Sequence, residues 1–200
     1  MVFAEGKKTE VIYLNHWNKM DRQKMILKIA PHVGSAPMTV VREAARVKKL
    51  HLKEQKGSGA QPYNEYWCVL DVDEHEDLPN ALQCALDNGI SVALSNPCLE
   101  IWFLFHFDSE TKWLHRDEAQ KRAYDHLRCT KSTFGGTHIS RLFPQYETAR
   151  KHAKALEIKH ADDGVKGAGN PSSNIWKLID IIRTGKPCDA EDSGTELGRK

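Results

Sequence analysis

Two aspartates, Asp71 and Asp73, follow an apolar run in the sequence, and a glutamate, Glu5, follows the first apolar residues of the chain. Because side chains two positions apart in extended backbone point the same way, Asp71 and Asp73 can bind one ligand together. Carboxylates this close repel each other, which raises the pKa of one of them unless a cation neutralises the pair. Oxygen ligands suit Mg²⁺ or Mn²⁺, and such an ion can activate a water and stabilise charge on a phosphoryl group. The pattern therefore predicts a metal site for phosphodiester chemistry.

Each of these acidic motifs also has a simpler interpretation. An Asp-x-Asp pair after a strand is often a turn or helix-cap element. Glu5 can be a loop acid, and Glu10 can be a first-turn helix acid that the helix dipole favours. Their joint placement favours a site, because ligands of an open parallel sheet bind beyond the carboxyl ends of its strands.

Three further polar residues can belong to the same site. Glu100 is flanked by apolar residues, so its carboxyl group must be paired or functional. His75 lies beside the aspartates, where it either orients a phosphate and carries a proton or is a solvated turn residue. Asn170 opens a segment, 170–173, that is either a turn with a helix N-cap or a loop that faces the site.

Composition and charge exclude several classes of protein. The 200 residues are 40% hydrophobic and 28% charged, which is ordinary for a globular chain. The longest apolar run, 101–105, is too short to cross a bilayer, so no membrane partner is expected. An acidic residue at position 5 is not compatible with a secretory signal, and we therefore expect a cytoplasmic protein. The net charge of +2 neither requires nor excludes a nucleic-acid partner.

Two other kinds of site are not expected. The five cysteines form no C-x-x-C pair, so they are expected to be buried or incidental thiols rather than zinc ligands. Gly6-Lys7 lacks the preceding glycine that a Walker phosphate loop requires, so the chain is not expected to hydrolyse nucleoside triphosphates.

Apolar periodicity predicts the elements that position these residues. Strands are expected over 2–4, 25–29, 66–70 and 90–94, and helices from Thr9 and over 37–56, 78–86 and 99–107. This alternation indicates an α/β fold with a parallel sheet. From position 116 onward the strand signal disappears, and helices are expected over 116–127, 144–160 and 171–184. We therefore predict an α/β core over 1–107, a helical extension packed on it over 108–185, and a flexible tail over 186–200.

Four motifs, in this order, resemble the RloB-like family: EGKKTE (5–10), CVLDVDEH (68–75), SNPCLEIWFLFHF (95–107) and NPSSNIW (170–176). The resemblance covers nearly the whole chain. Members of that family are small Toprim-related proteins encoded near restriction and phage-defence loci. The resemblance implies a Toprim-like fold, in which a small parallel sheet is flanked by helices.

The same resemblance implies roles for individual acids. Glu5 corresponds to the Toprim glutamate, and Asp71 and Asp73 correspond to its Asp-x-Asp pair, so all three are expected to be catalytic and to bind metal. In related nucleases of the OLD type, further acids complete a two-metal site; here Glu10 is the candidate metal ligand and Glu100 the candidate catalytic acid, at spacings that differ from the OLD pattern. Relatives also carry a longer first strand, so either this start is truncated or the first strand has about four residues.

We expect from the site and the resemblance a Mg²⁺- or Mn²⁺-dependent endonuclease that cuts DNA or RNA, including tRNA, in defence against phage. Five residues are expected to contact the nucleic acid: Lys7, Lys8, His75, Lys131 and Asn170. The alternative is a non-catalytic subunit that binds nucleic acid or a partner, such as an ATPase or a restriction-type subunit. Homo-oligomers are compatible with both functions.

Overall fold

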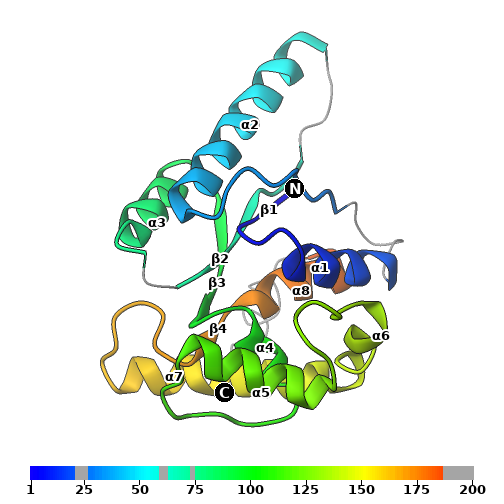
Figure 1. Cartoon of the computed structure of the whole chain (residues 1–200). Helices are drawn as coiled ribbons and strands as arrows, with labels where there is room; N and C mark the ends of the chain where they lie inside the picture. Colours follow the sequence, from blue (N-terminus) through cyan, green and yellow to red (C-terminus); the bar gives the residue numbers. More distant parts are fainter. Residues whose placement is uncertain (21–26, 59–62, 73–74, 187–200) are drawn as a thin grey trace, which may run out of the picture.

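A small, mostly parallel sheet lies at the centre of the molecule (Figure 1). This computed structural model describes residues 1–20, 27–58, 63–72 and 75–186. The strands are β1 (Val2–Ala4), β2 (Trp67–Asp71), β3 (Ser91–Asn96) and β4 (Ser172–Ser173), paired in that order. The first three are parallel, and β4 runs antiparallel to β3. The predicted α/β class, with a small parallel sheet and a helical C-terminal region, is confirmed.

Helices surround this sheet. They are α1 (Thr9–Met20), α2 (Pro37–Ser58), α3 (Leu78–Asp87), α4 (Glu100–Leu104), α5 (Arg116–Leu127), α6 (Gly136–Ile139), α7 (Tyr146–Asp162) and α8 (Ile175–Thr184), with a 3₁₀ turn at Phe143–Gln145 before α7. Among the described residues, none of these helices is both long and apolar enough to cross a membrane.

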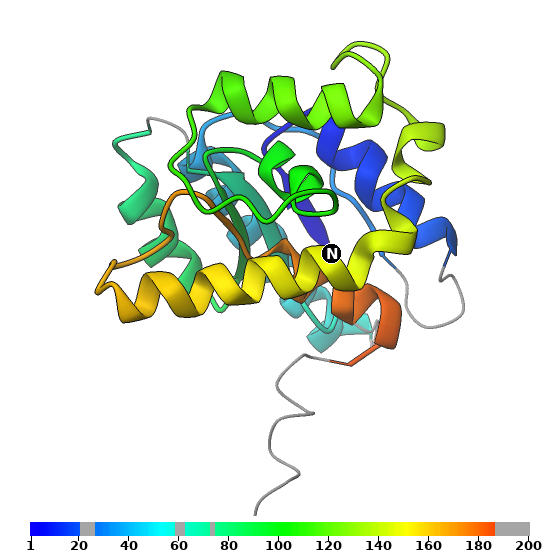
Figure 2. The ribbon, with the colours of Figure 1, turned by 90° about the horizontal axis from the view of Figure 1, so that it is seen from below.

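The two faces of the sheet bury two separate hydrophobic clusters. Side chains alternate along β2, so that Trp67 and Val69 enter one cluster while Cys68 and Leu70 enter the other. Helices α2 and α3 cover the face of Cys68 and Leu70, and the remaining long helices cover the opposite face (Figure 1). On that side, α4 lies between α5 and α7 (Figure 2). Burial on both faces explains why the sequence of β2 is a continuous apolar run.

Two predictions about strands differ from the structure: one concerns a strand whose residues are only partly described, and the other is wrong. Residues 25 and 26 of the predicted strand over 25–29 lie outside the described residues, and the remainder forms only an isolated bridge between Ile29 and Val2. The prediction that no strand follows position 116 is wrong, because Ser172–Ser173 form β4. A two-residue strand has no periodicity to detect; it forms through tertiary pairing, including a 2.8 Å hydrogen bond between the hydroxyl groups of Ser95 and Ser173.

Helix boundaries were predicted with mixed success. The helix predicted over 116–127 is confirmed as α5, whereas the one predicted over 99–107 is shorter and ends at Leu104 in a series of turns. The helix predicted over 171–184 starts only at Ile175, after β4. Helix α6 was missed because its four residues, GTHI, contain no helical repeat of apolar positions.

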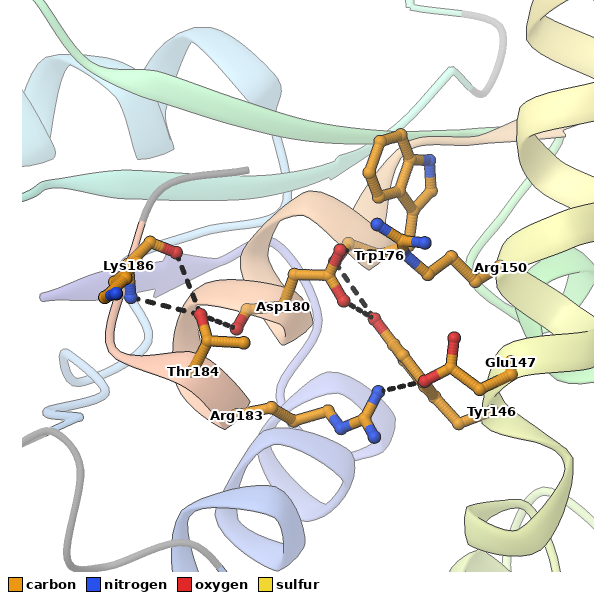
Figure 3. A network of polar contacts seen from close by, with 8 residues as sticks. All are labelled: Tyr146, Glu147, Arg150, Trp176, Asp180, Arg183, Thr184 and Lys186. Atoms are coloured by element: carbon orange, nitrogen blue, oxygen red, sulfur yellow. Dashed lines mark hydrogen bonds and ion pairs between the residues drawn. The ribbon is translucent and has the colours of Figure 1, made fainter. Parts of the chain in front are cut away.

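Helices α7 and α8 are joined by a buried carboxylate, Asp180 (Figure 3). The hydroxyl group of Tyr146 donates to Asp180 Oδ1 at 2.6 Å, and Arg150 Nε donates to Oδ2 at 2.8 Å. The guanidinium group of Arg150 also lies over the ring of Trp176, 5.3 Å from its centre. Asp180 is thus an acid whose charge is neutralised by close, direct partners.

We predict that Asp180→Ala lowers the free energy of unfolding by about 1–3 kcal/mol, because the Tyr146 hydroxyl group and Arg150 lose their acceptor in a buried place. The matched control is Glu157→Ala, which removes a half-exposed ion pair with Lys177 between the same helices and should cost less than about 1 kcal/mol. Urea unfolding followed by circular dichroism measures both. Equal losses in the two variants would contradict the assigned role of Asp180.

Candidate active site

Four buried carboxylates gather where the parallel strands end. Glu5 follows β1, Asp71 is the last residue of β2, Glu10 lies in the first turn of α1, and Glu100 begins α4 after β3. Their exposed fractions are 8%, 6%, 9% and 3%, respectively. We call these four residues the carboxylate cluster.

Sheet register brings the acids of β1 and β2 together. Ala4 pairs with Val69, and the N–H of Glu5 donates to the carbonyl oxygen of Val69 at 3.1 Å. The side chain of Glu5 then turns back onto β2, where its Oε2 accepts from the N–H of Asp71 at 3.2 Å. Asp71 Oδ1 in turn accepts from the N–H of Leu99 at 2.9 Å, which ties β2 to the start of α4.

Glu10 and Glu100 are held by their surroundings in different ways. A Cβ atom at position 6 would clash with the carboxyl group of Glu10, which therefore occupies the space that Gly6 leaves open. The hydroxyl group of Tyr124, from α5, donates to Glu100 Oε1 at 2.7 Å. The Glu-Gly pair in the sequence therefore has a structural reason: the glycine admits a second acid.

Burial and mutual repulsion dominate the electrostatics of the cluster. Burial raises the pKa of Asp71 well above its usual range, and the charges of Glu10, Glu100 and Glu5 raise it further. Burial also raises the pKa of Glu5 and of Glu10, in the latter case with repulsion from Glu100. Negative charge is therefore costly at this edge of the sheet unless something positive joins it.

Three basic side chains border the cluster, each 3.6–3.9 Å from a carboxylate oxygen. Arg116 Nη2 lies 3.7 Å from Asp71 Oδ2, His75 Nε2 lies 3.6 Å from Glu5 Oε1, and Lys131 Nζ lies 3.9 Å from Glu100 Oε1. Their side chains are 32%, 35% and 56% exposed, respectively, so they stand between the acids and solvent. Two of them, His75 and Lys131, were predicted from the sequence to contact nucleic acid.

Arg116 and Tyr124 are the site residues that the sequence analysis missed. Both come from α5, which begins more than ten positions beyond Glu100, the last acid of the cluster in sequence order, and reaches the cluster only through tertiary packing. One signal was present, because Arg116 opens the helix, where the dipole disfavours a positive charge. A cation at that position is easier to explain when it faces an acid outside the helix.

The remaining predicted site residues have varied surroundings. Lys7 and Lys8 are exposed, and Lys8 Nζ donates to the carbonyl oxygen of Ser132 at 2.6 Å. The amide of Asn170 bonds to both backbone groups of Leu114, at 3.0 and 2.9 Å, so it fixes the segment before α5. Asp73 lies outside the described residues. Contacts of these residues with nucleic acid stay predictions.

The donor chemistry of the cluster fits Mg²⁺ or Mn²⁺, since it offers only carboxylate oxygens and carries excess negative charge. Among the residues that the structure describes, no three His, Cys, Asp or Glu side chains are arranged to hold an ion as they stand. Glu5 and Asp71 are tied instead to backbone N–H groups. Binding of an ion by these residues would therefore require side-chain movement, and Asp73 is a further candidate donor in the sequence.

Fold and cluster together define the class: a mixed α/β protein with buried carboxylates at the carboxyl ends of parallel strands. The family model described as RloB-like protein matches residues 1–182, so the chain belongs to the RloB-like family. Comparison with curated proteins gave no match, and neither did comparison with solved structures. The family expected from the four sequence motifs is thereby confirmed.

We predict that Asp71→Asn stabilises the metal-free protein. The substitution removes one of four clustered charges and leaves an amide oxygen to accept from the N–H of Leu99, so the free energy of unfolding should rise by on the order of 1 kcal/mol. For a chain of this size that is a rise in Tm of about 2–4 °C, measured by differential scanning calorimetry in EDTA. Glu76→Gln, at an exposed acid of the following loop, is the control and should leave Tm unchanged. A loss of stability in Asp71→Asn would mean that the charge of Asp71 is structural.

Proposed function

We propose that this RloB-like protein is a Mg²⁺- or Mn²⁺-dependent nuclease that hydrolyses phosphodiester bonds of DNA or RNA, with tRNA among its candidate substrates, in defence against phage. The observation that carries the proposal is the burial of four acids at the carboxyl ends of the strands, where the basic side chains recorded beside them among the described residues lie 3.6–3.9 Å from their oxygens. This is the position where open α/β sheets bind their ligands.

A comparison within the molecule supports a functional rather than structural role for these acids. Asp180 is also buried, but its oxygens receive hydrogen bonds from Tyr146 and Arg150 at 2.6 and 2.8 Å. The basic side chains that border the carboxylate cluster are 3.6–3.9 Å from its oxygens and partly exposed. Because buried charge is costly when it is poorly paired, the cluster reduces stability in a way that a bound cation would reverse.

The roles within the proposed site follow from position and chemistry. Glu5, Asp71, Asp73 and Glu10 would hold the metal, which when bound lowers the pKa of a water and offsets charge on the phosphoryl group. Arg116 borders Asp71 on the solvent side, where its guanidinium group can bind a phosphate oxygen and stabilise charge as it develops. Glu100, oriented by the hydroxyl group of Tyr124, is the candidate to accept a proton from the attacking water. Lys7, Lys8, Lys131 and His75 would attract the backbone around the site.

The direct test is cleavage of plasmid, single-stranded DNA and total tRNA, each in Mg²⁺, Mn²⁺ or EDTA. We predict metal-dependent cleavage by the wild type and a loss of at least about 100-fold in Asp71→Asn, because a group that organises charge at the reaction centre is removed. Glu76→Gln should cleave at the wild-type rate. Cleavage in EDTA, or wild-type activity of a folded Asp71→Asn protein, would exclude the proposed mechanism.

A second candidate function is a non-catalytic subunit that binds nucleic acid or a partner, such as an ATPase or a restriction-type subunit. It is favoured by the finding that, within the described residues, the acids are not arranged to hold an ion as they stand. The same assay separates the two functions: protein that binds a nucleic acid with no cleavage in either metal would support the second.

A further inference from the structure

Trp113 is a large apolar side chain left in solvent beside the candidate site. It is 67% exposed, whereas the other four tryptophans of the chain are at most 8% exposed. Its neighbour Leu114 is buried, and both backbone groups of Leu114 are bonded to the amide of Asn170. The segment is thus anchored on one side of Trp113, and the indole is presented outward by a fixed backbone rather than by a loose loop.

A pocket of about 230 Å³ lies beside this tryptophan. Its lining includes Val72, Pro97, Trp113, His115, Arg116 and Asn170. Two of these residues connect the pocket to the carboxylate cluster: Val72 directly follows Asp71, and Arg116 lies 3.7 Å from Asp71 Oδ2. The pocket therefore opens next to the proposed reaction centre. A group bound in it could be connected through a few covalent bonds to a phosphate that lies near Asp71.

The chemistry of the lining fits a flat aromatic group attached to a phosphate. Trp113 offers a ring face, Val72 and Pro97 are apolar, and Arg116 and His115 supply positive or hydrogen-bonding groups at one end. The lining also includes Asn96, and both side-chain amides are engaged within the protein: Asn170 bonds to the backbone of Leu114, and Asn96 Nδ2 donates to the carbonyl oxygen of Ala168 at 2.8 Å. These bonds limit the amide groups that can recognise particular base edges. Proteins that bind single strands with little sequence preference stack the bases on aromatic side chains and place cations near the phosphates. They do not read the base edges.

A base in a duplex cannot use this pocket without leaving its stack, because both of its faces are covered by neighbouring bases. We propose that Trp113 stacks an unpaired base of the substrate, so that the protein selects single-stranded nucleic acid, either DNA or an RNA loop. This inference rests on the proposed function and narrows its substrate class. It assigns Trp113 to substrate binding and Arg116 to the phosphate that joins the stacked nucleotide to the reaction centre.

Binding measured without cleavage tests this assignment. Asp71→Asn protein is titrated with dye-labelled single-stranded DNA, single-stranded RNA and a blunt DNA duplex, and binding is followed by fluorescence anisotropy. We expect both single strands to bind more tightly than the duplex. Adding Trp113→Ala should weaken single-strand binding roughly 5- to 150-fold, the effect of losing one stacked base, whereas Trp113→Phe should keep most of the affinity. Leu86→Ala, at an apolar side chain that is 73% exposed on α3, is the matched control and should have no effect.

A second measurement locates the contact. Because Trp113 is the exposed tryptophan, acrylamide should quench its fluorescence in the free protein, and a bound single strand should protect it; Trp113→Phe should abolish that protected signal. Unchanged affinity in Trp113→Ala, equal dependence of duplex binding on Trp113, or no binding of any of the three oligonucleotides would overturn the inference. Single-strand binding that depends on Trp113, in a wild-type protein that cuts nothing, would uphold it and reject the nuclease. Metal-dependent cleavage by the wild type, with unchanged single-strand binding in Trp113→Ala, would uphold the nuclease and reject the stacking role of Trp113.

Discussion

The parallel pairing of β1, β2 and β3 is the constraint on which the candidate site depends. Parallel strands end at one edge, so acids that are more than sixty positions apart in the chain, Glu5 and Asp71, meet as neighbours. The hydrogen bond from the N–H of Asp71 to Glu5 is possible only in this register. A slip of one residue would turn each side chain of β2 to the opposite face and remove Asp71 from the cluster. The alternation of the β2 side chains between the two hydrophobic clusters therefore also fixes the site.

Asp180 and the carboxylate cluster are both buried, but their acids have different surroundings, and we assign them different roles. Asp180 contributes to stability because donors from α7 surround it within hydrogen-bonding distance. In the carboxylate cluster, the charges of neighbouring acids repel one another. Gly6 has no side chain, and the carboxyl group of Glu10 occupies the space this leaves. Places where a structure tolerates such local cost are commonly where it binds something.

Much of the fold could be predicted from the sequence, and the site only in part. The continuous apolar run at 66–70 indicated β2 within one residue, and helical periodicity predicted the bounds of α5 correctly. β4 and α6 could not be predicted, since two and four residues are too few for a repeat. The acids after the strands were identified from local pattern and family resemblance. Helix α5 and the segment before it lie far from the acids in sequence, and only tertiary packing brings them to the carboxylate cluster. The sequence therefore did not reveal Arg116, Tyr124 or the pocket at Trp113.

We propose that the carboxylate cluster binds a divalent cation. Titration of the metal-free protein with Mn²⁺, by isothermal calorimetry together with thermal unfolding, tests it most directly. We predict saturable binding by the wild type, with a gain in stability of about 2.7 kcal/mol at a Mn²⁺ concentration a hundred times the Kd, or roughly 5–10 °C in Tm. Asp71→Asn should lose both the binding and the gain. A wild-type protein that takes up no Mn²⁺ at millimolar concentration, or an Asp71→Asn variant that binds it equally well, would contradict the role of the cluster as a metal site.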